Sequence, residues 1–83
     1  MDKYLIILYV PKVEEKYEVF IPVNKKMNLV ISLLEKAILE ITDHYYIPNQ
    51  KSALYDRYSG EKVDSTAFVK DSIVKNGSEL VLL

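Results

Sequence analysis

The sequence predicts an α+β fold, with one helix packed across one face of a mixed sheet of four to five strands. Two apolar, strand-like segments stand at opposite ends of the chain, at residues 4–10 and 80–83. A segment with helical period lies between them, at about residues 25–43. Because the chain has 83 residues and shows no linker or internal repeat, we expect a single domain over residues 1–83.

The first two strands are predicted to form an N-terminal hairpin. Residues 4–10 are apolar or aromatic on both faces, which is typical of a central strand covered on both sides. The side chains of residues 16–23 instead alternate between an apolar face and a second face, as in a half-buried strand. Their apolar face comprises Tyr17, Val19, Ile21 and Val23. Pro22 has no N–H to donate to a ladder, so this second strand is expected at an edge of the sheet.

The helical segment is amphipathic. Its apolar face comprises Met27, Val30, Leu33, Leu34, Ala37, Ile38 and Ile41. The polar face comprises Asn28, Ser32, Glu35, Lys36, Glu40 and Asp43. Leu39 falls in the middle of that polar face, which makes it a candidate partner contact, although an exposed leucine is usually incidental. Either Asn24 or Asn28 can cap the start of the helix.

A third strand is predicted at residues 53–58, ended by a turn at Ser59 and Gly60. Its buried face is ambiguous, because each choice places one charged residue inward, either Asp56 or Arg57. The strand therefore lies at an edge, or a bulge shifts its register.

The remaining segments complete the predicted fold. Val63 can start a further stub of strand, and Phe68 and Ile73 are expected to anchor a polar loop onto the core. The two apolar strands at the chain ends both favour central positions, so we expect them side by side. They would run parallel, because the helix supplies the crossover between them. This arrangement is the β-grasp.

Composition excludes several classes of function. The chain has no cysteine, so thiolate metal sites and cysteine nucleophiles are absent. The net charge of −1 and the lack of a basic stripe argue against nucleic-acid binding. The longest apolar run, 4–10, is far shorter than the roughly 20 residues of a membrane helix. We therefore expect a cytoplasmic protein without direct membrane insertion.

Catalytic patterns are incomplete in this sequence. His44 is the only histidine, which leaves no multi-histidine metal site, and we expect it at the helix end. Gly60 and Gly77 each stand alone in a turn, so no phosphate-binding loop is present. We expect no enzyme, no cofactor and no metal site.

Aromatic residues are the strongest candidates for binding, because tyrosine is enriched at interface hot spots. The chain has seven tyrosines and no tryptophan. The candidate partner-binding residues are Phe20, Leu39, Tyr45, Tyr46, Tyr55 and Tyr58. The alternative interpretation is that each tyrosine fills an edge of the core. If the sheet face away from the helix is apolar, a homodimer or a larger protein would cover it.

The whole chain resembles the ubiquitin-like superfamily. The matching features are the N-terminal hairpin, the single helix, Ile47-Pro48, a strand ending near Gly60, and the order Phe68, Ile73, Leu80-Val81-Leu82. Within it, the chain looks most like the YukD/EsaB-type proteins of bacterial type VII secretion systems. The shared traits are the length, the apolar helix, the segment 73–80 and the ending Leu82-Leu83. Asp56, in place of a strand hydrophobe, and the aromatic pair Tyr45-Tyr46 depart from that pattern.

The resemblance implies a non-catalytic interaction module that acts as an accessory or regulatory component of such a system. Its protein partners would be secretion-machinery components, with a membrane ATPase among the candidates. Conjugation to other proteins is not expected, because the sequence lacks a C-terminal Gly-Gly. The alternative is an unrelated regulatory or adaptor β-grasp domain of another soluble assembly.

Overall fold

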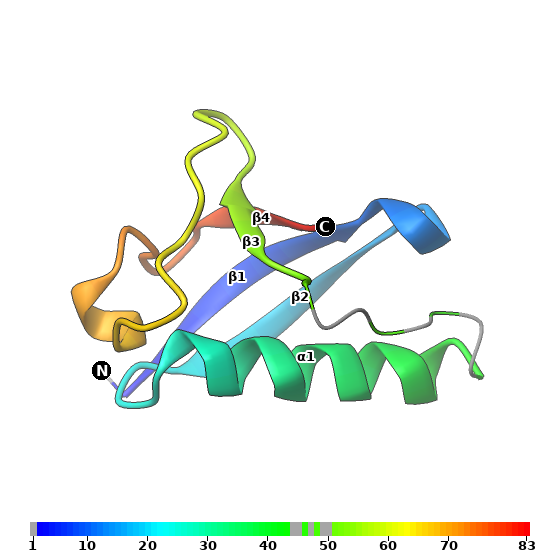
Figure 1. The fold of residues 1–83 in the computed structure, drawn as a ribbon, viewed down its shortest axis with the longest axis horizontal. Helices are drawn as coiled ribbons and strands as arrows, with labels where there is room; N and C mark the ends of the chain where they lie inside the picture. Colours follow the sequence, from blue (N-terminus) through cyan, green and yellow to red (C-terminus); the bar gives the residue numbers. More distant parts are fainter. Residues whose placement is uncertain (1, 44–45, 47, 49–50) are drawn as a thin grey trace.

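The computed structural model describes residues 2–43, 46, 48 and 51–83. Its strands are β1 (Lys3–Val10), β2 (Glu15–Pro22), β3 (Leu54–Asp56) and β4 (Glu79–Leu82), and its helix is α1 (Met27–Ile41). Two short 3₁₀ helices are η1 (Pro11–Val13) and η2 (Val69–Asp71). The four strands form one sheet in the order β2-β1-β4-β3, and α1 lies across one face of it (Figure 1).

The sheet has the predicted β-grasp topology. Strand β1 pairs antiparallel with β2 and parallel with β4, and β4 pairs antiparallel with β3. The two apolar end strands therefore lie side by side and parallel, as the crossover through α1 requires. Strand β2 lies at an edge, which confirms the position expected from Pro22.

The hydrogen bonds of β1 determine which way the backbone of β2 points. The amide of Ile7 donates to the carbonyl of Ser78 at 2.9 Å, so Ile7 bonds toward β4 and not toward β2. Its partner in the β1–β2 register, Glu18, therefore belongs to a non-hydrogen-bonded pair. By the same alternation Pro22 turns its ring nitrogen outward, where the missing N–H breaks no ladder bond.

Strand β3 is short, and its far side is covered. Leu54 faces the core, and the half-buried Asp56 is the last residue of the strand. The amide of Asp56 donates to Glu61 at 2.8 Å, and the amide of Val63 donates to Leu54 at 2.9 Å. Residues 61–63 thus cover the backbone edge of β3. They form an isolated bridge between Lys62 and Tyr55, in place of a strand beginning at Val63.

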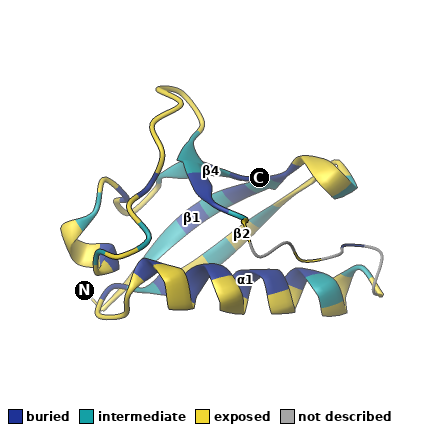
Figure 2. Ribbon diagram, in the orientation of Figure 1, coloured by how far each residue is buried: buried dark blue, intermediate teal, exposed yellow. Residues whose placement is uncertain are grey.

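The core fills the space between α1 and the sheet (Figure 2). Every second residue of β1 points into it, and the buried stripe of α1 faces the sheet. The fully buried aliphatic residues include Ile6, Leu8, Met27, Leu54, Val63, Leu80 and Leu82.

The buried face of α1 is rotated relative to the predicted one. Leu33 and Ile41 are 52% and 65% exposed, whereas Ile31 and Glu35 are buried. The prediction was wrong at these positions because it assumed that the sheet alone covers α1. Tyr46 and Ser52, which follow the helix, also pack against α1 and cover Glu35.

The N-cap of α1 is neither of the two candidate asparagines, although the Asn28 Oδ1 accepts a hydrogen bond from the amide of Leu29 at 2.7 Å. Lys26 is the N-cap and makes no side-chain capping bond. The amides of Met27 and Asn28 donate to the carbonyls of Ala67 and Ser65, at 2.8 and 2.9 Å. These bonds satisfy amides that a helix start otherwise leaves without partners.

The loop that supplies these carbonyls is anchored one residue later than predicted. Val69 and Val74 are fully buried, whereas Phe68 and Ile73 are exposed. The expectation for Phe68 and Ile73 was therefore wrong. The amide of Val69 donates to Lys25 at 2.9 Å, a bond that draws the valine into the core beside α1.

Candidate functional site

The face of the sheet that α1 leaves uncovered carries a group of apolar and aromatic side chains. We call it the open sheet face, and it comprises Leu5, Ile7, Tyr9, Phe20, Tyr55 and Val81. The strand registers place these residues on one side, because their alternate neighbours point into the core. Phe20 is 66% exposed, and the others are half-buried. Apolar area of this kind on a sheet face is typical of a protein-binding surface.

A polar cluster borders the open sheet face beside β3. The Glu79 carboxylate accepts hydrogen bonds from the hydroxyls of Tyr9 at 3.0 Å and Tyr58 at 2.7 Å. It also forms a 2.9 Å ion pair with Arg57. The Arg57 guanidinium lies over the Tyr9 ring, 4.2 Å from its centroid, which is a favourable cation–π position. The Glu79 carboxylate and the Arg57 guanidinium thus hold two aromatic rings in fixed positions.

The ionisation of the cluster follows from these contacts. Hydrogen bonds from Tyr58 and then Tyr9 lower the pKa of Glu79, because they stabilise its carboxylate. The same bond raises the pKa of Tyr58, and burial followed by the bond to Glu79 raises the pKa of Tyr9. At neutral pH the cluster therefore holds one carboxylate, one guanidinium and two neutral phenols.

A tight turn fixes the position of Tyr58. The Asp56 carboxylate accepts bonds from the amides of Tyr58 at 3.1 Å and Ser59 at 2.8 Å. Gly60 has φ of +75°, a conformation that favours glycine, and its amide donates to the carbonyl of Asp56. Tyr58 is 73% exposed even though its hydroxyl is bonded, so the ring is presented to solvent in one position.

The structure divides the predicted binding residues. Phe20 and Tyr55 lie on the open sheet face, and Tyr58 borders it. Leu39 is half-buried on α1, away from that face. Tyr46 is only 2% exposed, so its place in a contact surface is corrected to the core. Tyr45 and His44 lie outside the described residues.

Three residues of the cluster were missed by the sequence analysis. Arg57 and Glu79 look like ordinary surface charges in a sequence, and nothing in their spacing connects them. The strand registers bring them together, because the amide of Arg57 donates to the carbonyl of Glu79 at 2.9 Å. Tyr9 alternates along β1 with the buried Leu8 and Val10, and so faces away from the core. This alternation was the only available signal for Tyr9.

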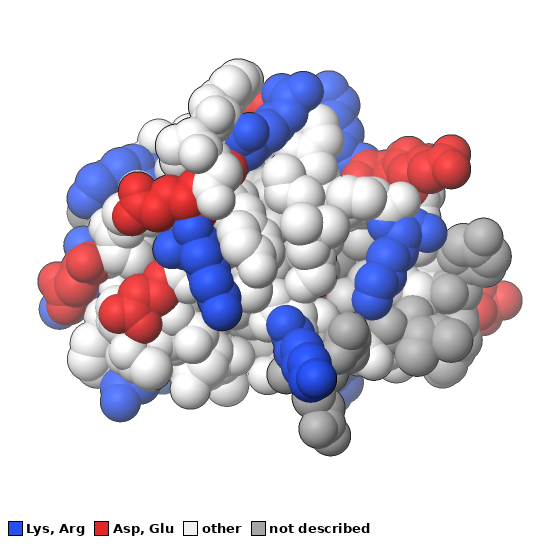
Figure 3. Space-filling view, turned by 45° about the horizontal axis from the view of Figure 1, so that its top comes forward, with Lys and Arg blue, Asp and Glu red and all other residues white. Residues whose placement is uncertain are grey.

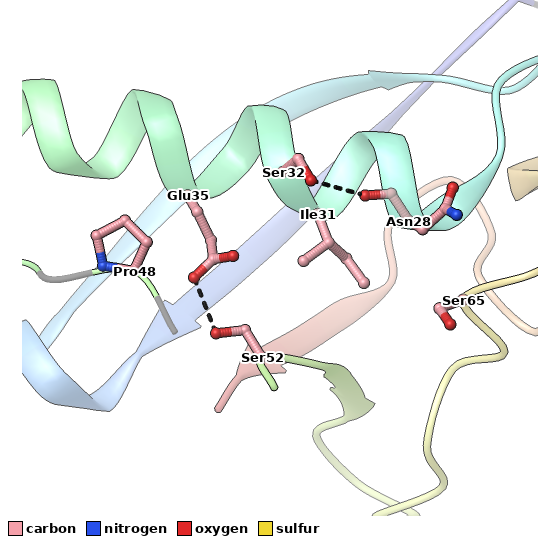
Figure 4. A pocket seen from close by; sticks show the side chains of 7 residues that line it. All are labelled: Asn28, Ile31, Ser32, Glu35, Pro48, Ser52 and Ser65. Atoms are coloured by element: carbon pink, nitrogen blue, oxygen red, sulfur yellow. Dashed lines mark hydrogen bonds between the residues drawn. The ribbon is translucent and has the colours of Figure 1, made fainter. Parts of the chain in front are cut away.

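A second polar feature lies on the other side of the molecule, between α1 and the segment that follows it. A cavity of about 420 Å³ opens there (Figure 4). Glu35 points toward Ser52, whose hydroxyl donates to its carboxylate at 2.8 Å. The buried Tyr46 hydroxyl donates to the same carboxylate oxygen at 2.8 Å. Burial, followed by the bond to Glu35, raises the pKa of Tyr46 to about 12.

The described residues contain no group of three or more histidine, aspartate or glutamate side chains that could hold a metal ion. In the same part of the chain, no helix is long and apolar enough to cross a membrane. Charged side chains of both signs border an uncharged centre on the side of the molecule seen in Figure 3. Such an arrangement suits a mixed apolar and polar contact with another protein.

Comparisons with known proteins agree on the fold. No protein-family profile matches the chain, and the search of curated proteins found no significant match. Among solved structures, a chain of the MycP5-free ESX-5 inner membrane complex superposes on all of this chain with a TM-score of 0.80 and 13% identity. The present chain spans only 21% of that chain's length.

Two further structures have the same architecture. A protein from a study of molecular mimicry of SUMO in DNA repair has a TM-score of 0.69 and 17% identity, over all of this chain and 92% of its own. The ubiquitin-like domain of an Arabidopsis thaliana protein has a TM-score of 0.64 and 19% identity, over all of this chain and 78% of its own. The fold is therefore a ubiquitin-like β-grasp.

Proposed function

We propose that this chain is a non-catalytic ubiquitin-like interaction module that docks onto a larger protein through the open sheet face. We further propose that it is an accessory component of a bacterial type VII secretion system, of the YukD/EsaB type, on the cytoplasmic side of the membrane. Its partners would then be proteins of that machinery, with a membrane ATPase as the first candidate.

The observation that carries the docking proposal is the open sheet face together with its polar border. Phe20 supplies an exposed apolar contact, and Tyr58 supplies a ring whose position is fixed by Glu79. Binding to rings that are already ordered costs less side-chain entropy than binding to mobile ones. A contact with an apolar centre and a charged, hydrogen-bonded border also matches the usual anatomy of protein interfaces.

The secretion-system part of the proposal has separate support. The sequence shares with YukD/EsaB-type proteins its length, its apolar helix, the segment 73–80 and the ending Leu82-Leu83. The fold superposes on part of a chain from an ESX-5 inner membrane complex. At 13% identity this likeness concerns the fold, and it supports the assignment only together with the sequence resemblance.

An affinity pull-down tests the identity of the partner. The tagged protein would be recovered from a detergent-solubilised lysate of its native host, and the bound proteins identified by mass spectrometry. We expect a membrane secretion ATPase or its companion proteins. Recovery of a soluble complex without secretion components would contradict the secretion role and favour an adaptor domain of another assembly.

A further inference from the structure

A second surface lies on the opposite side of the sheet from the open sheet face, between β2 and α1. Two adjoining hollows of about 180 and 230 Å³ run along it. Val19, Leu34 and Ala37 line both hollows, so they lie at its middle. We call this surface the β2–α1 groove. We propose that a second copy of this chain docks there, with its β2 antiparallel to the first and the two grooves facing each other.

The backbone of β2 is available for such pairing. Lys16, Glu18 and Phe20 alternate with the residues that bond to β1, so their N–H and C=O groups point away from the sheet. In the part of the chain that the structure describes, no segment covers this edge, whereas residues 61–63 cover β3 at the other edge. An uncovered strand edge is a template for adding another strand.

The groove also contains an apolar stripe of α1 that the fold leaves exposed. Leu33, Ala37 and Ile41 are spaced four residues apart and therefore share one side of the helix. Leu33 lies beside residues 19–22 of β2, and Ile41 lies beside residues 17–19. The stripe is thus centred on Ala37, and the edge strand beside it is centred on Val19.

A two-fold axis through this centre makes the groove complementary to itself. It places Val19 opposite Val19 of the second copy, and Leu33 of one copy near Ile41 of the other. The small Ala37 lies at the point where the two helices come closest, which allows close packing. An interface of this isologous kind is the commonest in homo-oligomers.

Charges at the two ends of β2 favour a second copy as the occupant. The exposed acidic pair Glu14 and Glu15 lies at the start of β2, and the exposed basic pair Lys25 and Lys26 follows its end. Antiparallel pairing about Val19 places Glu14 and Glu15 of each copy at the register positions of Asn24 and Val23 of the other, within three residues of its Lys25 and Lys26. This complementarity occurs twice in the symmetric dimer and would fix its orientation.

Other registers of the same strand are less favourable. Pairing about Glu18 would place Glu18 directly opposite itself, and like charges at such positions are destabilising. Pairing about Tyr17 would leave Leu33 outside the contact, because Leu33 lies beside residues 19–22 of β2. The register about Val19 avoids both problems. The inference shares Phe20 with the open sheet face, because the backbone of Phe20 lies on the pairing edge. It does not rest on the docking role of that face.

Sedimentation equilibrium of the purified full chain, over protein concentrations up to about 1 mM, tests the dimer. We expect a mass twice the 9.6 kDa of one chain. Ala37→Glu should give the monomer mass with an unchanged far-UV circular dichroism spectrum, because Ala37 is exposed. Tyr58→Ser, on the other side of the sheet, is the control and should stay dimeric. A wild-type protein that is monomeric up to that concentration would overturn the proposal.

A charge swap tests the orientation. The variant Lys25→Glu with Lys26→Glu should raise the dimer dissociation constant at least about tenfold, because each acidic pair then meets another. Adding Glu14→Lys and Glu15→Lys should restore the dimer with the net charge of the wild type. If the variant with all four substitutions dimerises as weakly as the variant with only the two lysine substitutions, the proposed pairing is wrong.

A cysteine variant tests the register, because the chain has no cysteine of its own. In the proposed dimer the two Val19 residues form a non-hydrogen-bonded pair with Cα atoms about 4.5 Å apart, within the range of a disulfide. Val19→Cys should therefore form a covalent dimer under mild oxidation by oxidised glutathione, and Ser59→Cys should not. Equal cross-linking of both variants would reject the register.

Discussion

The two faces of the sheet are built from alternating residues of the same strands, yet they differ in chemistry. The face under α1 is aliphatic and closed, with Ile6, Leu8 and Leu54 fully buried. The open sheet face is half aromatic and partly exposed, with Phe20 and Tyr55 among its members. This difference suggests that the first face determines stability and that the second is available for binding.

Each side of the sheet also has a carboxylate that accepts bonds from tyrosine. On the α1 side, Glu35 is buried and accepts bonds from Tyr46 and Ser52. On the open side, Glu79 accepts bonds from Tyr9 and Tyr58. The first carboxylate holds Tyr46 and Ser52 against the helix, and the second holds aromatic rings at the surface. Mutations on the two sides should therefore have effects of different kinds.

The largest effect is expected in the core. Leu54→Ala removes a fully buried side chain between α1 and the sheet, and should lower the free energy of unfolding by about 2 to 5 kcal/mol. Urea denaturation followed by circular dichroism measures this. Ile7→Ala, on the half-buried open side, is the matched aliphatic control and should cost clearly less. Equal losses would remove the proposed division between the two faces.

A smaller effect is expected at the buried carboxylate. Tyr46→Phe removes a hydrogen bond to Glu35 with little change of shape, and should cost about 1 to 3 kcal/mol in unfolding free energy. Ser52→Ala, which removes the other hydroxyl from the same oxygen, is the comparison. A Tyr46→Phe variant as stable as the wild type would mean that this bond contributes nothing.

The raised pKa of Tyr46 makes this effect depend on pH. The pKa rises from 10.0 to about 12 in the folded state, so the phenol ionises more readily once the chain unfolds. The contribution of Tyr46 to stability is fully present below pH 10.0 and is lost as the pH rises from there toward about 12. The stability difference between wild type and Tyr46→Phe should therefore shrink over that interval. A constant difference would contradict the assigned pKa direction.

A still smaller effect on stability is expected at the open sheet face. Phe20→Thr keeps strand propensity and removes only an exposed ring, so the unfolding free energy should change by about 0.5 kcal/mol or less. Partner recovery in the pull-down should nevertheless fall. A large loss of stability would show that Phe20 supports the fold.

The smallest effect on stability is expected at the exposed cluster. Because the pKa of Glu79 is lowered in the folded state, its contribution is present above its ordinary value of 4.5 and is lost as the pH falls below that. Glu79→Gln should therefore lower the urea midpoint slightly at neutral pH and less in acid. An equal shift at both values would mean that the carboxylate charge is not involved.

The sequence was sufficient for the architecture because the relevant signals are local. Unbroken apolar runs identified β1 and β4 as central strands, and Pro22 identified β2 as an edge. The assignments that failed depend on packing between distant segments. Glu35 is polar on a helical wheel, and only the return of Tyr46 and Ser52 to α1 explains its burial.

The candidate site was predicted only in part, because only some of its residues have a local signal in the sequence. The exposure of Phe20 and Tyr58 follows from strand alternation and a glycine turn, both of which are visible in the sequence. The cluster around Glu79 depends on the pairing of β3 with β4, which are separated by more than 20 residues along the chain. Spacing in the sequence gives no information about such a contact.

The central claim is that the open sheet face and its border bind the partner. The most direct test compares binding of the recovered partner protein to the wild type, to Tyr55→Ser with Tyr58→Ser, and to Leu29→Ser with Ile73→Ser. The last variant changes exposed apolar residues outside both proposed surfaces. Isothermal titration calorimetry should show affinity lost at least about tenfold for the tyrosine variant and kept for the control, with unchanged far-UV spectra. Equal affinity for all three proteins would contradict the account.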